Sequence, residues 1–192
     1  MNDAASGPAS QPSERLSRAF RVFGRVGFWV QFVFLIVVAI LGLYVFSITG
    51  ARARAGNLLA FLGLAIPLFT TFWCWRYARF GRTLAVDPED VAPGAPARTA
   101  WIGVWAGTFG VVVSLLSLFG AASALLVVML ANPQVGIQVS PATAGASAYT
   151  ISAVDAVSII SLVLTLTAEL LVVAISLRLV FLAAAVARQP AA

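Results

Sequence analysis

The sequence predicts an all-α integral membrane protein: a four-helix transmembrane bundle with both termini in the cytoplasm, preceded by an amphipathic interfacial helix. The 192 residues are 61% hydrophobic and only 10% charged, whereas soluble domains are about a quarter charged. The mean hydropathy is +0.99. Four apolar stretches each reach the roughly 18 to 20 residues that cross a bilayer. Ten of the twelve basic residues, all arginines, lie on one side of these stretches, which the positive-inside rule assigns to the cytoplasm.

The segment before the first span divides into two parts. Residues 1–12 are mostly small or polar, with two prolines, and predict a disordered tail. Over residues 13–25, arginines recur on one helical face, and Leu16 and Phe20 lie on the other. We expect this amphipathic helix to rest on the membrane surface, with its arginines on anionic lipid headgroups; docking of a partner protein is the alternative. These arginines are Arg15, Arg18, Arg21 and Arg25.

The transmembrane domain is expected over residues 26–185. Aromatic residues gather where the spans meet the cytoplasmic side, Trp73 and Tyr77 among them, as in the interfacial belt of membrane proteins. Arg52 and Arg54 fall on the outer side, where the long second connection carries no charge. The four spans are predicted at about 26–48, 58–75, 101–131 and 154–185.

The third span carries small residues every three or four positions. At about 100° per residue they stay on one side of the helix. Such a seam lets helix backbones approach closely, which drives helix association in lipid. We expect an internal packing seam, with dimerisation as the alternative. Its members are Gly103, Gly107, Gly110, Ser114, Ser117, Ala121 and Ala124.

The fourth span carries a polar stripe, so one of its faces is turned away from lipid. Asp155 follows Ser152 by three residues, which is the spacing of an N-terminal capping box. Glu169 lies about 21 Å further along the helix, in the hydrocarbon region, where a charged carboxylate is costly. We expect it to be protonated or hydrogen-bonded across helices. The stripe consists of Asp155, Ser158, Thr165, Glu169 and Ser176.

Three residues on the first two spans lie at the depth of Glu169 and are its candidate partners. They are Gln31, Thr70 and Thr71. A buried acid with such partners serves either as an interhelical hydrogen bond or as a proton or cation relay.

Several chemistries are excluded by what the sequence lacks. There is no histidine, so Ser/His and Cys/His nucleophiles and histidine metal ligands are absent. The single cysteine, Cys74, has no second cysteine for an intrachain disulfide. We therefore expect no enzymatic activity, cofactor or metal site, and no binding of nucleic acid.

Short aromatic-rich motifs at the span ends resemble a family of membrane proteins of unknown function. The family occurs in cyanobacteria, plants and other bacteria, and includes a chloroplast inner-envelope protein described both as an iron permease and as a subunit of a protein-import translocon. The resemblance covers about residues 15–183, and the family has no agreed catalytic residues. The positions that match its pattern are Phe28, Trp29, Gln31, Trp73, Arg76, Tyr77 and Asp155.

Two classes of function follow. We expect an accessory or assembly subunit of a larger membrane complex, or a homo-oligomer, in the inner or intracytoplasmic membrane of a bacterium. The alternative is a small permease or channel-like subunit for a cation such as iron or protons, with Glu169, Gln31 and Asp155 along the route. A water-accessible cavity that reaches Glu169 from one side would favour the permease, and a sealed bundle with an exposed groove of small or aromatic residues would favour the accessory role.

Overall fold

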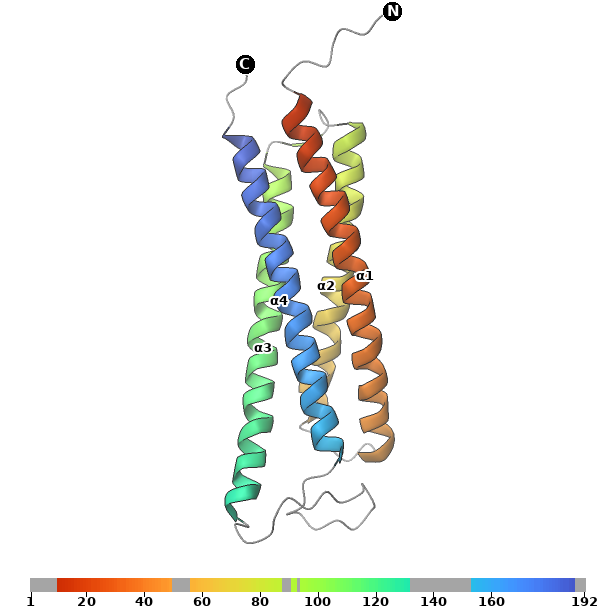
Figure 1. The fold of residues 1–192 in the computed structure, drawn as a ribbon, viewed down its shortest axis with the longest axis vertical. Coiled ribbons are helices and arrows are strands. Elements are labelled where there is room, and N and C mark those ends of the chain that lie inside the picture. The colour runs from red at the N-terminus through yellow and green to blue at the C-terminus, as the bar shows by residue number, and fades with distance from the viewer. Residues whose placement is uncertain (1–9, 50–55, 88–90, 93, 132–152, 189–192) are drawn as a thin grey trace, which may run out of the picture.

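The computed structural model describes residues 10–49, 56–87, 91–92, 94–131 and 153–188, and within them it contains four α-helices and no strand. The helices form one elongated up-and-down bundle, with the start of the first helix and the end of the last helix on the same side (Figure 1). We call this side the terminal end and the opposite side the distal end. The all-α prediction is confirmed. The helices are α1 (Ser10–Thr49), α2 (Gly56–Val86), α3 (Ala95–Ala131) and α4 (Ala153–Ala187).

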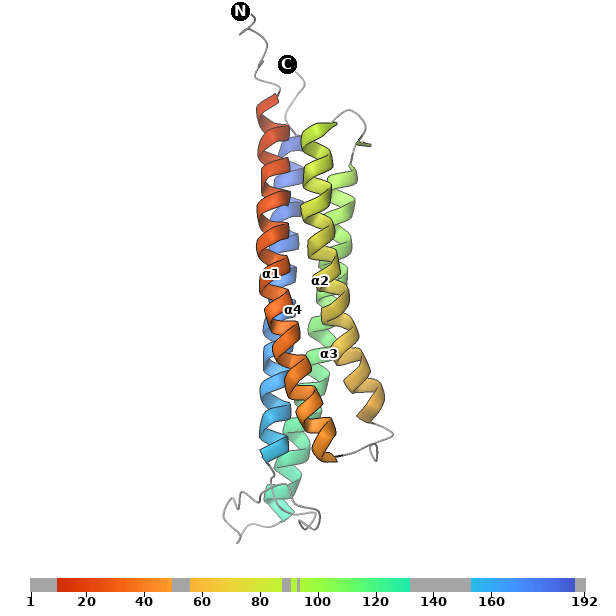
Figure 2. The ribbon, with the colours of Figure 1, turned by 90° about the vertical axis from the view of Figure 1, so that its right-hand side faces the viewer.

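Three of the four helices, α1, α3 and α4, are long and apolar enough to cross a membrane, as judged from the described residues. Helix α2 carries Arg76, Arg79 and Arg82 in its second half. It nevertheless runs antiparallel to α1 along the bundle and leads to the start of α3 (Figures 1 and 2).

The structure does not set residues 13–25 apart as a separate surface helix. Helix α1 runs without interruption for 40 residues and already begins at Ser10, inside the expected tail, whose residues 1–9 lie outside the described part. The four arginines of this segment are exposed, while Leu16 and Phe20 are buried in the core of the bundle. The predicted apolar face therefore packs against protein, because α2 and α4 extend far enough to cover it.

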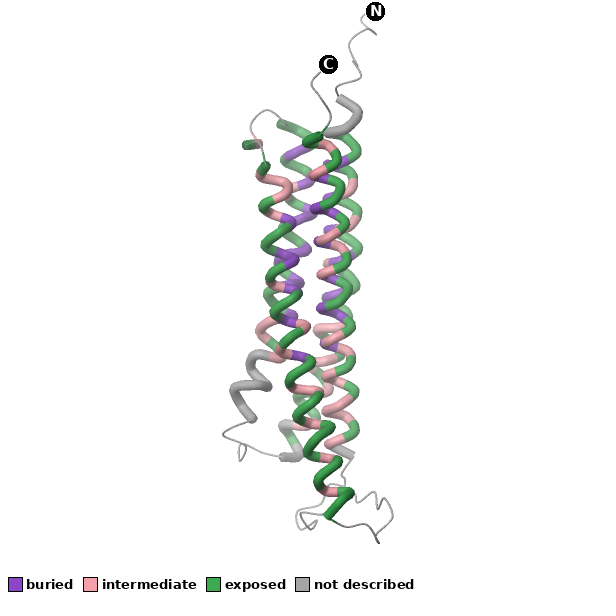
Figure 3. Tube along the Cα trace, turned by 90° about the vertical axis from the view of Figure 1, so that its left-hand side faces the viewer, coloured by how far each residue is buried: buried purple, intermediate pink, exposed green. Residues whose placement is uncertain are grey.

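The core occupies the terminal half of the bundle (Figure 3). Phe20 meets Tyr77 edge to face, with ring centroids 5.9 Å apart, and Leu179 is fully buried beside them. Among the described side chains, none is buried on the distal side of Gln31, Pro67, Ser114 and Thr165 in the respective helices. Toward the distal end α2 also leans away from α4 (Figure 2). The bundle is therefore tight at its terminal end and loose at its distal end.

The contact between α1 and α2 depends on glycines. A Cβ atom at Gly81 would lie 2.8 Å from the backbone nitrogen of Arg21 and 2.9 Å from the carbonyl oxygen of Ser17. A Cβ atom at Gly24 would collide with the backbone of Ala78. The two helix backbones therefore touch, which is the contact that small residues permit between membrane helices.

Candidate functional site

Three polar side chains from three helices meet in the middle of the bundle. Gln31 of α1 donates from Nε2 to Oγ1 of Thr70 in α2 over 2.9 Å. The hydroxyl group of Thr70 in turn donates to Oε1 of Glu169 in α4, and the two oxygens are 3.2 Å apart. Gln31 is 1% exposed, and Thr70 and Glu169 are 0% exposed. We call these three residues the central polar cluster.

The Thr70 hydroxyl has one hydrogen and several acceptors. Its Oγ1 also lies 3.2 Å from the carbonyl oxygens of Ile66 and Pro67, so these carbonyls compete with Glu169 for the same hydrogen. The neighbouring Thr71 is buried as well, but donates to the Pro67 carbonyl over 2.7 Å. Of the two threonines predicted as partners, the structure brings only Thr70 to the carboxyl group.

The second carboxyl oxygen of Glu169, Oε2, is buried and has no hydrogen-bond partner in the described part of the chain. The carboxyl group lies against Gly110 of α3, where a Cβ atom would be 2.7 Å from Cδ and 2.8 Å from Oε2. Because glycine has no side chain, α3 leaves room for the carboxyl group at this position.

The small-residue seam of α3 packs against α4 in a regular antiparallel register. Gly103 lies against Ser176, Gly107 against Val173, and Gly110 against Glu169. The seam is buried from Gly103 to Ser114, half-buried at Ser117 and Ala121, and exposed at Ala124. The terminal part of the seam therefore contacts α4, while its distal part lies where the bundle loosens.

On the terminal side of the cluster, Tyr77 forms a second polar contact. Its hydroxyl lies 2.9 Å from Oγ of Ser176 and donates to the carbonyl of Ala100 over 3.2 Å. The indole Nε1 of Trp73 donates to the carbonyl of Thr99 over 3.2 Å. Trp73 and Tyr77 were predicted in the interfacial belt, but both are buried and join α2 to α3. The pairing of Tyr77 with Ser176 had no signal in the sequence beyond the place of Ser176 in the polar stripe.

The arginines nearest this region are directed to aromatic rings. The Arg178 guanidinium lies 4.7 Å from the ring centre of Phe23 in α1, and Arg76 lies 4.7 Å from that of Trp73. Such contacts between a cation and an aromatic face are favourable. Arg178 therefore contacts α1.

Asp155 does not belong to the central polar cluster. It lies in the first turn of α4, at the distal end, 14 residues before Glu169 and therefore about 21 Å away along the helix. A carboxylate there is favourable beside the helix N-terminus. Its proposed capping partner Ser152 lies outside the described residues.

No group of three or more His, Cys, Asp or Glu side chains within the described ranges could hold a metal ion. Cys74 is free and fully buried, and packs at Gly27, where a Cβ atom would lie 3.2 Å from its sulfur. Its position indicates core packing between α1 and α2.

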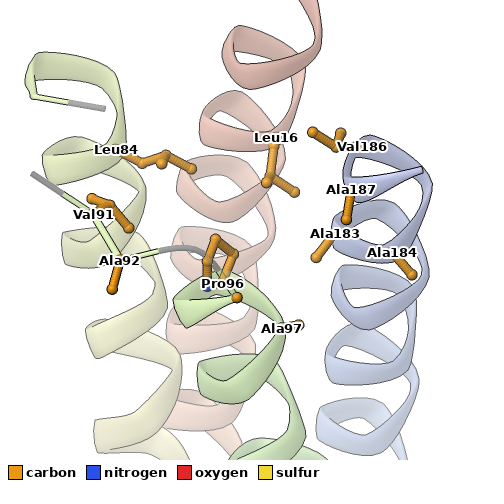
Figure 4. Close-up of a pocket in the computed structure, with 11 residues that line it drawn as sticks. Leu16, Leu84, Val91, Ala92, Pro96, Ala97, Ala183, Ala184, Val186 and Ala187 are labelled. Atoms are coloured by element: carbon orange, nitrogen blue, oxygen red, sulfur yellow. The ribbon is translucent and has the colours of Figure 1, made fainter. Parts of the chain in front are cut away.

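A pocket of about 440 Å³ lies at the terminal end of the bundle, where α1 and α3 begin and α2 and α4 end (Figure 4). Its walls are apolar, with Leu16 and Leu84 from α1 and α2, Pro96 from α3 and Ala183 from α4. None of its lining residues is titratable or belongs to the central polar cluster. The pocket therefore offers apolar contact and no acid–base chemistry.

Comparison with known proteins gives a family and one distant relative. Protein TIC 21, chloroplastic, from Arabidopsis thaliana is 28% identical over 114 residues, which is 59% of this chain and 36% of the relative. The chain thus aligns with little more than a third of that protein. No solved structure matches. Residues 10–182, nearly the whole chain, match the family described as "Protein of unknown function (DUF3611)", and the chain belongs to that family.

Proposed function

We propose that this protein is a four-span protein of a bacterial inner or intracytoplasmic membrane, and that it serves as an accessory or assembly subunit of a larger membrane complex. The charge distribution supports the orientation with both termini in the cytoplasm. All ten described arginines lie toward the terminal end, as the positive-inside rule expects of a cytoplasmic side. The apolar length of α1, α3 and α4 supports the spans.

The helix lengths support a specific placement in the bilayer. From Asp155 to Arg178, α4 rises about 35 Å, which suits a hydrocarbon core of about 30 Å. Helix α1 has 40 residues and is about 60 Å long, twice that thickness. The terminal end of the bundle, with Arg15, Arg18 and Arg82, therefore extends into the cytoplasm beyond the headgroups.

The closed centre of the bundle is the observation that favours an accessory role over transport. Glu169 is 0% exposed and packed on Gly110. On its terminal side, Val172 is 2% exposed, and Tyr77 then bridges α2, α3 and α4. A conducting route would need these layers to separate. The resemblance described above is to a family whose chloroplast member is described both as a translocon subunit and as an iron permease, so it supports both candidate functions.

The accessory role is tested by isolation and by reconstitution. After extraction in mild detergent, we expect the protein to migrate in native electrophoresis within an assembly larger than the purified chain forms by itself. The purified chain in proteoliposomes should then carry no Fe²⁺ or proton flux above that of protein-free liposomes. A flux well above that background would contradict the accessory role.

A small cation permease is the second candidate, favoured by the unpartnered Oε2 of Glu169. An acid held in the membrane with free coordination capacity is typical of transport pathways. If this candidate is correct, Glu169→Gln abolishes the proteoliposome flux while the variant remains folded. A flux that persists in Glu169→Gln would remove the acid from the route.

A further inference from the structure

Two side-chain oxygens in the described part of the molecule are buried without a hydrogen-bond partner, and both belong to α4. They are Oε2 of Glu169 and Oγ of Ser161, eight residues and about 12 Å apart along the helix. Native proteins rarely leave such groups unsatisfied, and ordered water commonly completes them. The two oxygens therefore mark the two ends of a stretch of α4 that can hold water, with Glu169 at its terminal end and Ser161 toward the distal side.

The register of α3 on α4 shows what faces this stretch. The pairs Gly103 with Ser176, Gly107 with Val173 and Gly110 with Glu169 are equally spaced in opposite directions. Continued toward the distal end, the same register sets Ser114 opposite Thr165, Ser117 near Ser161, and Ala121 opposite Ser158. Both members of the first of these pairs are 5% exposed, as expected of facing residues. The polar stripe of α4 thus faces the small-residue seam of α3 from Glu169 to the distal end.

We propose that a file of water molecules occupies this stretch between α3 and α4 and delivers protons from the distal side to the carboxyl group of Glu169. Hydroxyl groups provide contacts along the way. Thr165 donates to the carbonyl of Ser161 over 2.9 Å, which leaves its oxygen lone pairs free to accept from water.

The route ends at Glu169. On the terminal side the next contact is between Gly107 and Val173, and Val172 is buried beside it. Tyr77 and Ser176 follow, but both of their hydroxyl hydrogens are already engaged, because Tyr77 donates to Ala100 and Ser176 then donates to Tyr77. Glu169 is therefore a proton-binding site with access from one side. The proposal rests on the α3–α4 contact and deepens the second candidate function, because water access to Glu169 from one side favours a permease; failure of the water file would leave the accessory role standing.

Hydrogen–deuterium exchange of the Glu169 carboxyl group tests the water file. The carboxylic acid band is assigned in the infrared spectrum of the full chain in liposomes by its loss in Glu169→Gln. Transfer to D₂O should shift this band at a rate that rapid mixing resolves. Thr165→Val keeps the shape but removes the hydroxyl, and should slow the shift by about tenfold, the factor that corresponds to one hydrogen bond.

Thr167→Val is the matched control, since Thr167 lies on the exposed side of α4 and donates to the Val163 carbonyl over 2.8 Å. It should leave the rate unchanged. A band that stays unshifted for hours in the wild type overturns the proposal, as does equal slowing by both variants. The absence of any Glu169 acid band across the pH range in which the protein stays folded overturns it too.

The side of access is tested with a membrane-impermeant thiosulfonate. Ser161→Cys should react in vesicles that expose the distal side, about tenfold faster than wild type, whose Cys74 is fully buried. Thr167→Cys, in contact with lipid, should react no faster than wild type. Reaction of Ser161→Cys from the terminal side, or from neither side, contradicts the proposed route.

Discussion

At the scale of single residues, Glu169 is held at two points: one carboxyl oxygen meets Thr70, and the carboxyl group lies against Gly110. The sequence placed Gln31, Thr70 and Thr71 at the depth of Glu169 in the membrane. Two of these three residues, Gln31 and Thr70, belong to the central polar cluster. The sequence could not separate Thr70 from Thr71, because adjacent residues share a depth and differ only in helix rotation. That rotation is set by the packing of α2 on α1.

The charge state of Glu169 gives the first prediction. Glu169→Gln keeps the shape and an oxygen that can accept from Thr70, so the folded protein should tolerate it. Glu169→Lys places an ammonium group against Gly110 without a partner and should be strongly destabilising, because an unpaired buried charge is costly. Thermal unfolding in detergent measures both. Equal losses in the two variants would show that Glu169 is ionised and paired with a cation.

At the scale of helices, the contact of α1 with α2 gives the second prediction. Gly24→Ala should destabilise the bundle by about 1–3 kcal/mol, as overpacking does, because the new Cβ meets the Ala78 backbone, which cannot move aside. Gly42→Ala in the same helix meets nothing within 4 Å. It should be neutral or stabilising by roughly 0.5–1 kcal/mol, since alanine favours helix over glycine. If the two variants change the free energy of unfolding in opposite directions, the result supports the contact between α1 and α2. A change in the same direction contradicts it.

The α3–α4 seam gives the third prediction. Gly107→Leu or Gly110→Leu should separate the two helices and lower the melting temperature in detergent markedly, because Val173 and Glu169 occupy the space. Val112→Leu is the control, since Val112 is 48% exposed on the other face of α3. If all three variants melt alike, the seam does not hold the helices together.

The sequence located the helices well, because hydropathy and residue spacing are local properties. It could not show that residues 13–25 continue α1, since an apolar face reads the same whether lipid or another helix covers it. The same ambiguity affects Tyr77, whose ring and hydroxyl suit an interface or a core equally. It also affects Ala124, which follows the seam in spacing but lies beyond the packed part of α3.

At the scale of the whole molecule, the distribution of arginines gives the fourth prediction. Both termini should lie in the cytoplasm, so a reporter enzyme that is active only there should work when fused after residue 192. The same fusion with a reporter that needs the periplasm or lumen should be inactive. Activity of that second reporter would show the opposite orientation. Replacing Arg76, Arg79 and Arg82 together by glutamine should reduce the bias, because they are charges next to a span.

The loose distal half has a consequence for how the protein responds to its surroundings. No described side chain is buried in this half. In the proposed membrane, lipid acyl chains would take the places that neighbouring side chains fill at the terminal end. The stiffness of that half is then a property of the lipid, and a more ordered, thicker bilayer should hold α2 closer to α4. Mass spectrometry of backbone amide exchange should show distal peptides that change with lipid composition, next to terminal peptides that do not.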